Sequence, residues 1–154
     1  MLTEFCRIAA QLNNALSIVP LLYGSLGLQL LTGEALNPDD IDVLIPAECL
    51  GAKWASLCEL MERNGYTLID LHEHTFSNGS QKISYAQIDD LESYADISLN
   101  HTPTVQHKGA QFFLLTLPQY LNVYKKSSED SYRRDKNNSK DIEKIALIKA
   151  FIST

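Results

Sequence analysis

The amino-acid sequence predicts a single domain of the α/β or α+β class, in which a small mixed β-sheet is flanked by helices. Two observations point to this class. The 154 residues are 45% hydrophobic and 21% charged, which is close to the composition of ordinary globular domains. Helical and strand-like hydrophobic patterns also alternate along the chain, as expected when helices pack on a sheet. This length can bury a core without a disulfide or a structural metal.

The first third of the chain predicts a helix, a strand and a second helix. Apolar residues recur at helical spacing through residues 1–15, the pattern of an amphipathic helix. Residues 17–23 form a short apolar run that ends at Gly24 and indicates a buried strand. We expect this strand to begin or bend at Pro20, because proline fits poorly inside a sheet. Leucines at helical spacing then predict a second helix, which stops at Gly33.

The middle of the chain predicts a strand, a helix and a hairpin. Residues 40–45 alternate in polarity and then become fully apolar between two prolines, as in a strand that enters a core. The next helix is predicted over residues 47–64, where apolar side chains recur at i, i+4, i+7 and i+8. Two β-rich stretches, residues 66–76 and 81–88, are joined by an Asn-Gly pair. This pair is the strongest short hairpin signal.

The last third of the chain predicts helices. Residues 89–110 show no clear period, so no element is predicted there. A helix is predicted over residues 117–125, and the polar residues 127–138 are expected to form either a loop or a frayed helix. Ser139 is expected to cap a final helix, in which isoleucines recur at helical spacing.

The net charge of −6 is unevenly distributed. Residues 125–149 hold eight basic and five acidic side chains and carry +3, whereas the rest of the chain carries −9. An acidic body with a basic tail repels polyanions in general and can still hold one phosphate-bearing ligand at the junction. The alternative is that the basic tail is only a solvated helical face.

The cysteines and the N-terminus bear on the cellular compartment. Cys6, Cys49 and Cys58 are odd in number and lack the CxxC spacing, so we expect reduced thiols that pack as small hydrophobic groups. The N-terminal residues lack the pattern of a signal peptide, and no apolar run approaches the ~20 residues of a membrane span. The sequence therefore predicts a cytoplasmic protein without a membrane partner.

The segment with the clearest chemistry joins Gly24-Ser25 to Asp40 and Asp42, after a gap of fourteen residues. Glycine lets a ligand approach the backbone, and a serine hydroxyl with the first free amides of a helix can hold a phosphate. Asp40 and Asp42 are two apart on a strand, so their side chains leave the same face about 7 Å apart. Such carboxylates beside a phosphate suit Mg²⁺. The alternative is that this segment combines a polar turn with a common Gly-Ser dipeptide.

Residues 22–45 thus carry an apolar stretch, Gly-Ser, a helix, and then Asp-Ile-Asp-Val on the next strand. This order resembles the signature of the nucleotidyltransferase superfamily, which has a DNA polymerase β-like fold. It is most similar to small bacterial members, the minimal and antibiotic-type nucleotidyltransferases. The resemblance implies one nucleotidyltransferase-like domain over residues 1–154, with a core of about residues 1–110 and a C-terminal helical extension of about residues 111–154.

The resemblance also implies a reaction and roles for individual residues. A nucleoside monophosphate would pass from a nucleoside triphosphate to a hydroxyl of a small molecule, an RNA or a protein, and pyrophosphate would be released. Gly24 and Ser25 would hold the nucleotide phosphates. Asp40 and Asp42 would be catalytic and would bind the Mg²⁺ cofactor.

A third carboxylate is expected on a later strand that faces the first two. Asp89, which closes the predicted strand 81–88, is the first candidate for this catalytic residue, and Asp96 is the second. Lys140, in the basic tail, is expected to reach the cleft and contact the nucleotide.

Three other functions remain as alternatives. The first is a catalytically inactive nucleotidyltransferase-fold module that binds or regulates, like an antitoxin, either as a homodimer or with a toxin-like partner. It is motivated by the ambiguous third carboxylate and by the lack of an arginine after Gly-Ser. The second is an RNA-binding protein that uses the basic tail, although nucleic acid is not the favoured partner. The third is a zinc site at His72 and His74, which we expect on one face of a strand.

Overall fold

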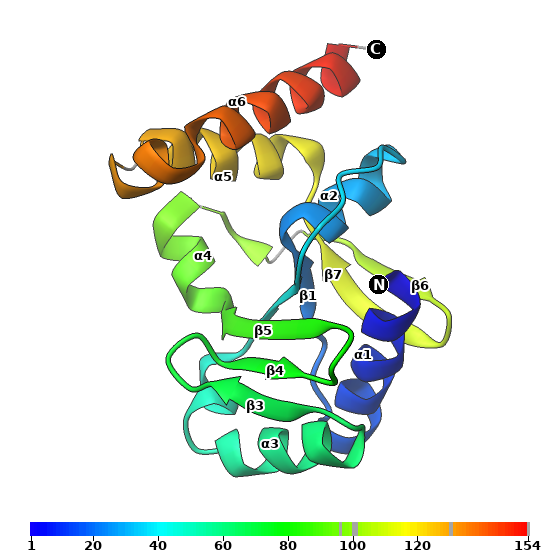
Figure 1. Cartoon of the computed structure of the whole chain (residues 1–154). Coiled ribbons are helices and arrows are strands. Elements are labelled where there is room, and N and C mark those ends of the chain that lie inside the picture. Colours follow the sequence, from blue (N-terminus) through cyan, green and yellow to red (C-terminus); the bar gives the residue numbers. More distant parts are fainter. Residues whose placement is uncertain (96, 100–101, 130, 154) are drawn as a thin grey trace.

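The structure is a computed structural model that describes residues 1–95, 97–99, 102–129 and 131–153, with side chains described except at 94 and 131–140. Seven strands of the described chain form one mixed sheet in the order β3-β4-β5-β2-β1-β7-β6 (Figure 1). The strands are β1 Leu21–Tyr23, β2 Ile41–Ile45, β3 Thr67–Asp70, β4 Thr75–Ser77, β5 Lys82–Gln87, β6 Thr104–His107 and β7 Ala110–Leu114. The helices are α1 Leu2–Leu16, α2 Gly24–Thr32, the 3₁₀ helix η1 Ala47–Leu50, α3 Trp54–Arg63, α4 Ile88–Ala95, α5 Leu117–Glu129 and α6 Ser131–Ser153.

The register of the three central strands places Tyr23, Asp42 and Ser84 side by side. β1 runs antiparallel to β2 and pairs Tyr23 with Asp42. β2 runs parallel to β5 and pairs Asp42 with Ser84. Residues paired in this way point to the same face of a sheet, so one face carries a tyrosine, a carboxylate and a hydroxyl in a row.

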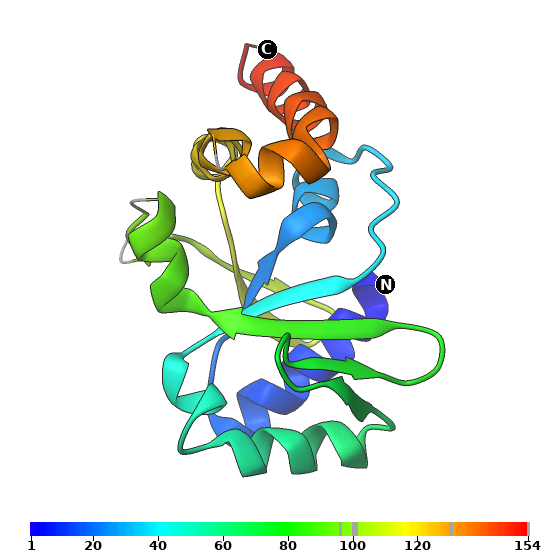
Figure 2. The ribbon, with the colours of Figure 1, turned by 60° about the vertical axis from the view of Figure 1, so that its left-hand side comes forward.

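Each face of the sheet buries its own core, because successive strand residues point to opposite sides. Leu22 and Val43 pack in a core formed mainly with α1 and α3. Leu21 and Leu44 pack in a second core with residues of α2, α4, α5 and α6. Figure 2 shows α1 and α3 below the sheet and the C-terminal helices above it. Asp42 is two residues from Leu44, so it faces the side of the C-terminal helices.

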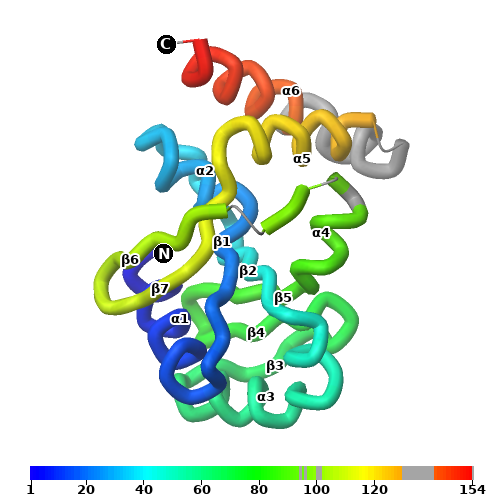
Figure 3. Tube along the Cα trace, turned by 180° about the vertical axis from the view of Figure 1, so that it is seen from behind, coloured from blue at the N-terminus to red at the C-terminus, as the bar shows by residue number. Residues whose placement is uncertain are grey.

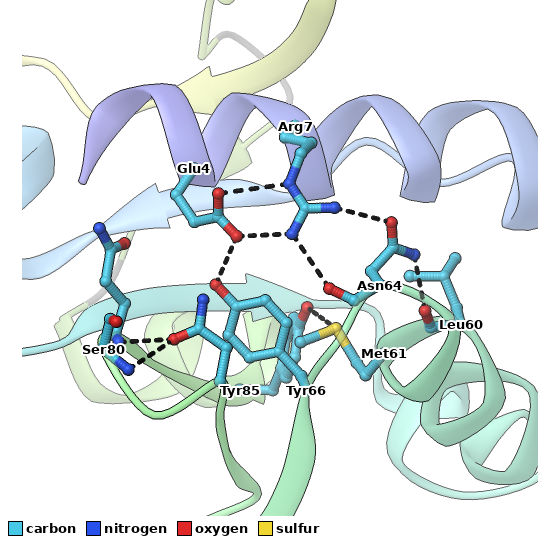
Figure 4. Close-up of polar contacts among 10 residues, drawn as sticks. Glu4, Arg7, Leu60, Met61, Asn64, Tyr66, Ser80 and Tyr85 are labelled. Atoms are coloured by element: carbon cyan, nitrogen blue, oxygen red, sulfur yellow. Dashed lines mark hydrogen bonds and ion pairs between the residues drawn. The ribbon is translucent and has the colours of Figure 1, made fainter.

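A polar network joins α1 to the end of α3, on the side of the sheet that these two helices cover (Figure 4). Glu4 accepts a hydrogen bond of 2.6 Å from Arg7 and one of 2.8 Å from the Tyr66 hydroxyl. Arg7 also donates to the backbone carbonyl of Asn64 at 3.1 Å. Burial raises the pKa of Tyr66 well above its ordinary value, so this hydroxyl stays protonated and remains a donor to Glu4.

The two C-terminal helices pack side by side (Figure 3). They are joined by a buried hydrogen bond of 2.9 Å, which the Ser127 hydroxyl donates to a carboxyl oxygen of Asp141. The predicted isoleucine stripe of the last helix is only partly buried. Ile148 is fully buried, whereas Ile142 and Ile152 stay about half exposed.

Several predicted elements are confirmed. The first helix, the helix that ends at Gly33 and the Asn-Gly hairpin between β4 and β5 form as predicted. The proline expectation also holds, because β1 begins directly after Pro20. The mixed sheet flanked by helices confirms the predicted fold class.

Four predicted boundaries are wrong. The strand expected over residues 17–23 has only three residues, since Pro20 cannot donate a ladder hydrogen bond. The helix expected over 47–64 divides into η1 and α3 at Gly51. The strand expected over 66–76 divides into β3 and β4 at a turn whose last residue, His74, has a left-handed φ of 52°. The last helix starts at Ser131, because polar residues continue a helix beyond its packed stripe.

Residues 89–110, for which no element was predicted, contain α4, β6 and the start of β7. β7 pairs with β1 and β6 pairs with β7, so this region supplies one edge of the sheet. Among the helices that the structure describes, none is long and apolar enough to cross a membrane.

Candidate functional site

The turn from β1 into α2 is built around Gly24. Its φ is +66°, a left-handed value that disfavours residues with a Cβ atom. A Cβ at this position would lie 2.6 Å from Oδ2 of Asp42 on the neighbouring strand. Among the described residues, no side chain caps the start of α2, and the first amides of a helix have no partner within the helix and can bind a ligand. Glycine suits this position for two reasons: its backbone adopts the left-handed conformation easily, and it has no Cβ that would collide with the carboxylate of Asp42.

Asp40 and Asp42 stand at the start of β2 and open into the same clefts. Asp42 is the second residue of β2, and Asp40 directly precedes the strand. Both are half-buried, and both line two of the clefts around this turn. The two carboxylates are therefore open to a ligand from the side on which Ser25 also lies.

Three clefts meet at Asp42. The largest, about 630 Å³, lies between Ser25, the loop at residues 36–40 and α6. The second, about 470 Å³, extends from Gly24 and Ser25 along β2 and β5 to α5. The third, about 390 Å³, lies over β5 and the turn between β3 and β4. Each of these volumes is in the range of small-molecule sites.

The C-terminal helices supply groups to these clefts that the sequence reasoning missed. Asp141 is 1% exposed and lines the largest cleft. Lys144 lines the two larger clefts, and its Nζ lies 5.1 Å from the centre of the Tyr124 ring. Lys140, which the sequence reasoning singled out, is in α6, but its side chain lies outside the described residues. The signal that could have found Lys144 is its spacing of one helical turn from Lys140.

The position beside Asp42 on the next strand is held by Ser84. Its hydroxyl makes a 2.8 Å hydrogen bond with the Thr75 hydroxyl of β4. Asp89 lies five residues later in the first turn of α4, is exposed, and lines none of the three clefts. The structure thus does not bring Asp89 to the aspartate pair, and its catalytic role stays a prediction. Asp96 lies outside the described residues.

The residues at the turn fit one Mg²⁺ ion better than a closed metal site. In the described part of the chain, no group of three or more His, Cys, Asp or Glu side chains is placed to hold a metal. Asp40 and Asp42 still offer two carboxylates next to the Gly24-Ser25 turn, and Mg²⁺ commonly takes one or two carboxylates, with phosphates and water completing its shell. The donor set therefore suits a metal that arrives with a phosphate ligand.

The zinc alternative expected His72 and His74 on one face of a strand, and this expectation is wrong. His72 and His74 lie in the turn between β3 and β4, not on a strand face. His72 is exposed, and His74 packs edge-on against Trp54 with ring centres 5.1 Å apart. The two imidazoles therefore do not share the face that a joint zinc site requires.

No protein-family model matches this chain. The chain is 46% identical over 149 residues to the uncharacterized protein YnaI of Bacillus subtilis (strain 168). The aligned region covers 97% of this chain and 96% of YnaI.

Solved structures with low sequence identity show the same fold. The crystal structure of ANT(2")-Ia in complex with adenylyl-2"-tobramycin has a TM-score of 0.59 at 15% identity, covering 98% of this chain and 88% of that one. An antigenic nucleotidyltransferase-like protein from Paracoccidioides brasiliensis has a TM-score of 0.65 at 13% identity, and the match covers 96% of this chain and 74% of that protein. The chain therefore belongs to the same family as YnaI, and its fold is that of the nucleotidyltransferases.

Proposed function

We propose that the protein is a Mg²⁺-dependent nucleotidyltransferase that transfers a nucleoside monophosphate from a nucleoside triphosphate to an acceptor hydroxyl. The observation that carries this proposal is the convergence of the Gly24-Ser25 turn with Asp40 and Asp42 on shared clefts. It is supported by the likeness of the fold to solved nucleotidyltransferases, and by the position of this chain's two aspartates in a cleft that α6 also lines.

Each part of the site has a distinct role in this proposal. The Ser25 hydroxyl and the first amides of α2 bind the phosphates, and Gly24 leaves room for them. Asp40 and Asp42 hold the Mg²⁺ ion. When bound, this ion supplies positive charge that stabilises the charge developing on the phosphate oxygens. Lys144 adds a positive charge from the α6 side of the same clefts.

The reaction is a displacement at the α-phosphorus. The acceptor occupies the largest cleft, and its hydroxyl oxygen forms the new bond to phosphorus. The bond from that phosphorus to the oxygen of the β-phosphate breaks, and pyrophosphate leaves with the bonding electron pair. The hydroxyl proton passes to a carboxylate that lines the cleft. Holding the two reactants in line is the main task left to the protein.

Label transfer from α-³²P nucleoside triphosphates tests this function. The wild-type chain, Asp42→Asn, Asp89→Asn and a distant exposed control, Glu59→Gln, are incubated with Mg²⁺ and candidate hydroxyl acceptors. Asp42→Asn is expected to lose at least ~100-fold in rate, because loss of a metal ligand removes several kcal/mol of charge stabilisation. Glu59→Gln should react like the wild type. Equal transfer by Asp42→Asn and the wild type contradicts the site. Loss of transfer in Asp89→Asn would show that Asp89 takes part in the reaction although it lies outside the three clefts.

Ser84 favours a second candidate function. The resemblance leads us to expect a third carboxylate on a later strand that faces the first two, and the residue beside Asp42 on β5 is a serine. A chain with only the aspartate pair can still bind a nucleotide with Mg²⁺ but turn it over slowly. It would then act as a binding or regulatory module, alone, as a homodimer or with a toxin-like protein. Tight binding of ATP and Mg²⁺ by calorimetry, without label transfer to any acceptor, would favour this module over the enzyme.

A further inference from the structure

One buried tyrosine of the C-terminal helices contacts the turn on which the proposed function depends. Tyr120 of α5 is 0% exposed, and its hydroxyl donates a 3.1 Å hydrogen bond to the carbonyl oxygen of Gly24. The two residues are 96 positions apart in the chain. This contact therefore links the C-terminal helices directly to the phosphate-binding turn.

The Tyr120 ring is held in place by its neighbours. It stacks on Tyr23 with ring centres 6.4 Å apart and planes 14° apart, and on Tyr124 at 6.0 Å and 12°. Burial raises the pKa of the Tyr120 hydroxyl well above its ordinary value. The hydroxyl therefore stays protonated, and its ring cannot swing away without breaking the stack.

Gly27 makes room for this hydroxyl. A Cβ atom at Gly27 would clash with the Tyr120 hydroxyl oxygen, and it would also lie 3.0 Å from the carbonyl oxygen of Leu22. Gly27, one turn into α2, is therefore required by the space that the Tyr120 hydroxyl fills and not by its backbone conformation. The hydroxyl occupies the space that any larger side chain would need.

The geometry of the peptide unit shows what this contact does. The carbonyl of Gly24 and the amide N–H of Ser25 belong to one planar peptide unit, and in a trans peptide they point in opposite directions. A donor that holds the carbonyl on the Tyr120 side therefore turns the Ser25 N–H away from Tyr120. Ser25 lines both of the larger clefts, and no described side chain caps α2 and takes this N–H.

We propose that Tyr120 is a positioning residue: its hydroxyl fixes the Gly24–Ser25 peptide so that the Ser25 amide is directed at the phosphates of a bound nucleotide. This inference rests on the proposed nucleotide binding at the turn. It explains why a residue of the C-terminal helices contacts the backbone of the turn rather than a side chain, since a backbone contact orients the amide directly.

Nucleotide affinity tests the proposal in the full chain. Tyr120→Phe removes only the hydroxyl, and the dissociation constant for ATP with Mg²⁺ is expected to rise about three- to tenfold, the usual effect of losing one hydrogen bond. The matched control is Tyr66→Phe, which removes another buried and hydrogen-bonded hydroxyl on the opposite side of the sheet. The control should lose thermal stability but keep its ATP affinity. Equal ATP affinity in Tyr120→Phe and the wild type overturns the proposal.

A second readout needs no nucleotide. The ¹⁵N–¹H resonance of the Ser25 amide should shift in Tyr120→Phe and stay in place in Tyr66→Phe, because a hydrogen bond to a carbonyl polarises the amide of the same peptide unit. An unmoved Ser25 resonance overturns the proposal. If the wild type does not bind ATP at all, the proposed function fails, and the Ser25 resonance still decides whether Tyr120 orients the turn.

A size-compensation experiment separates positioning from stability. Gly27→Ala should lower the melting temperature because its methyl group meets the Tyr120 hydroxyl. The double variant Gly27→Ala with Tyr120→Phe should regain part of that loss, yet still bind ATP weakly. Recovery of full ATP affinity together with stability would mean that the hydroxyl acts only in packing, and would overturn the proposal.

Discussion

Replacing Gly24 by alanine perturbs the candidate site where the turn meets Asp42. The new methyl group must adopt the left-handed φ of +66° and would lie 2.6 Å from Oδ2 of Asp42. The backbone conformation alone costs about 1–2 kcal/mol for a residue with a Cβ. The contact with Asp42 adds a smaller cost in stability, because the carboxylate ends a short side chain that can rotate. That rotation takes the carboxylate away from the turn.

Two effects of different size are therefore expected. The melting temperature should fall by about 2–8 °C, since 1 kcal/mol corresponds to about 2–4 °C in a domain of this length. The affinity for ATP with Mg²⁺ should fall at least about tenfold, because Asp42 is displaced and the methyl group occupies space beside the phosphates. The assays are thermal unfolding by circular dichroism and titration calorimetry with ATP and Mg²⁺.

Gly33→Ala is the matched control. Gly33 also has a left-handed φ, of +75°, but no atom lies within 4 Å of its missing Cβ. Its variant should lose a similar amount of stability from backbone strain and keep the affinity for ATP. If Gly24→Ala binds ATP as tightly as Gly33→Ala, the contact between the turn and Asp42 does not matter for binding, and the site is placed wrongly.

Three further predictions concern stability. Hydrogen bonding to Arg7 lowers the pKa of Glu4, so this pair stabilises the fold above about pH 4, and its contribution is lost as the pH falls through the lowered pKa. Glu4→Gln should therefore cost about 0.5–1 kcal/mol of unfolding free energy in urea at pH 7 and less at pH 3. An equal cost at both pH values would contradict this pH dependence. Ser127→Ala removes a donor from the buried carboxyl of Asp141 and should cost about 2 kcal/mol, whereas unchanged unfolding would mean that this bond does not join the C-terminal helices. Phe112→Ala empties a fully buried position in the sheet and should cost about 3–5 kcal/mol in the same assay, with a cost under ~1 kcal/mol ruling out the described packing.

The parts of the fold that sequence reasoning predicted depend on local signals. Helix α1 has a continuous apolar stripe, α2 ends at a left-handed glycine, and the hairpin between β4 and β5 has an Asn-Gly turn. Each signal acts within a few residues. The wrong boundaries fall where local patterns are incomplete, as at Ser139, where a helix continues through polar residues that have no apolar stripe.

The residues missed at the candidate site come from distant parts of the chain. Ser84 lies beside Asp42 through a parallel strand pair, and such a register cannot be found from spacing along the chain. Asp141 and Lys144 reach the clefts because α6 packs over this side of the sheet. Asp89 follows the predicted strand, and in the structure it lies in the first turn of α4 and lines none of the three clefts, so its catalytic role stays a prediction.

The sequence by itself determined the fold class and the central motif of this protein. Gly24-Ser25 at a strand-to-helix junction and two aspartates two residues apart follow from backbone sterics and strand alternation, which act locally. Only the tertiary structure decided that Ser84 stands beside Asp42 and that the Tyr120 hydroxyl holds the carbonyl of Gly24. These contacts join segments far apart in the chain. Their partners are selected by the packing of the whole core, because many strand orders and helix placements satisfy the same local patterns.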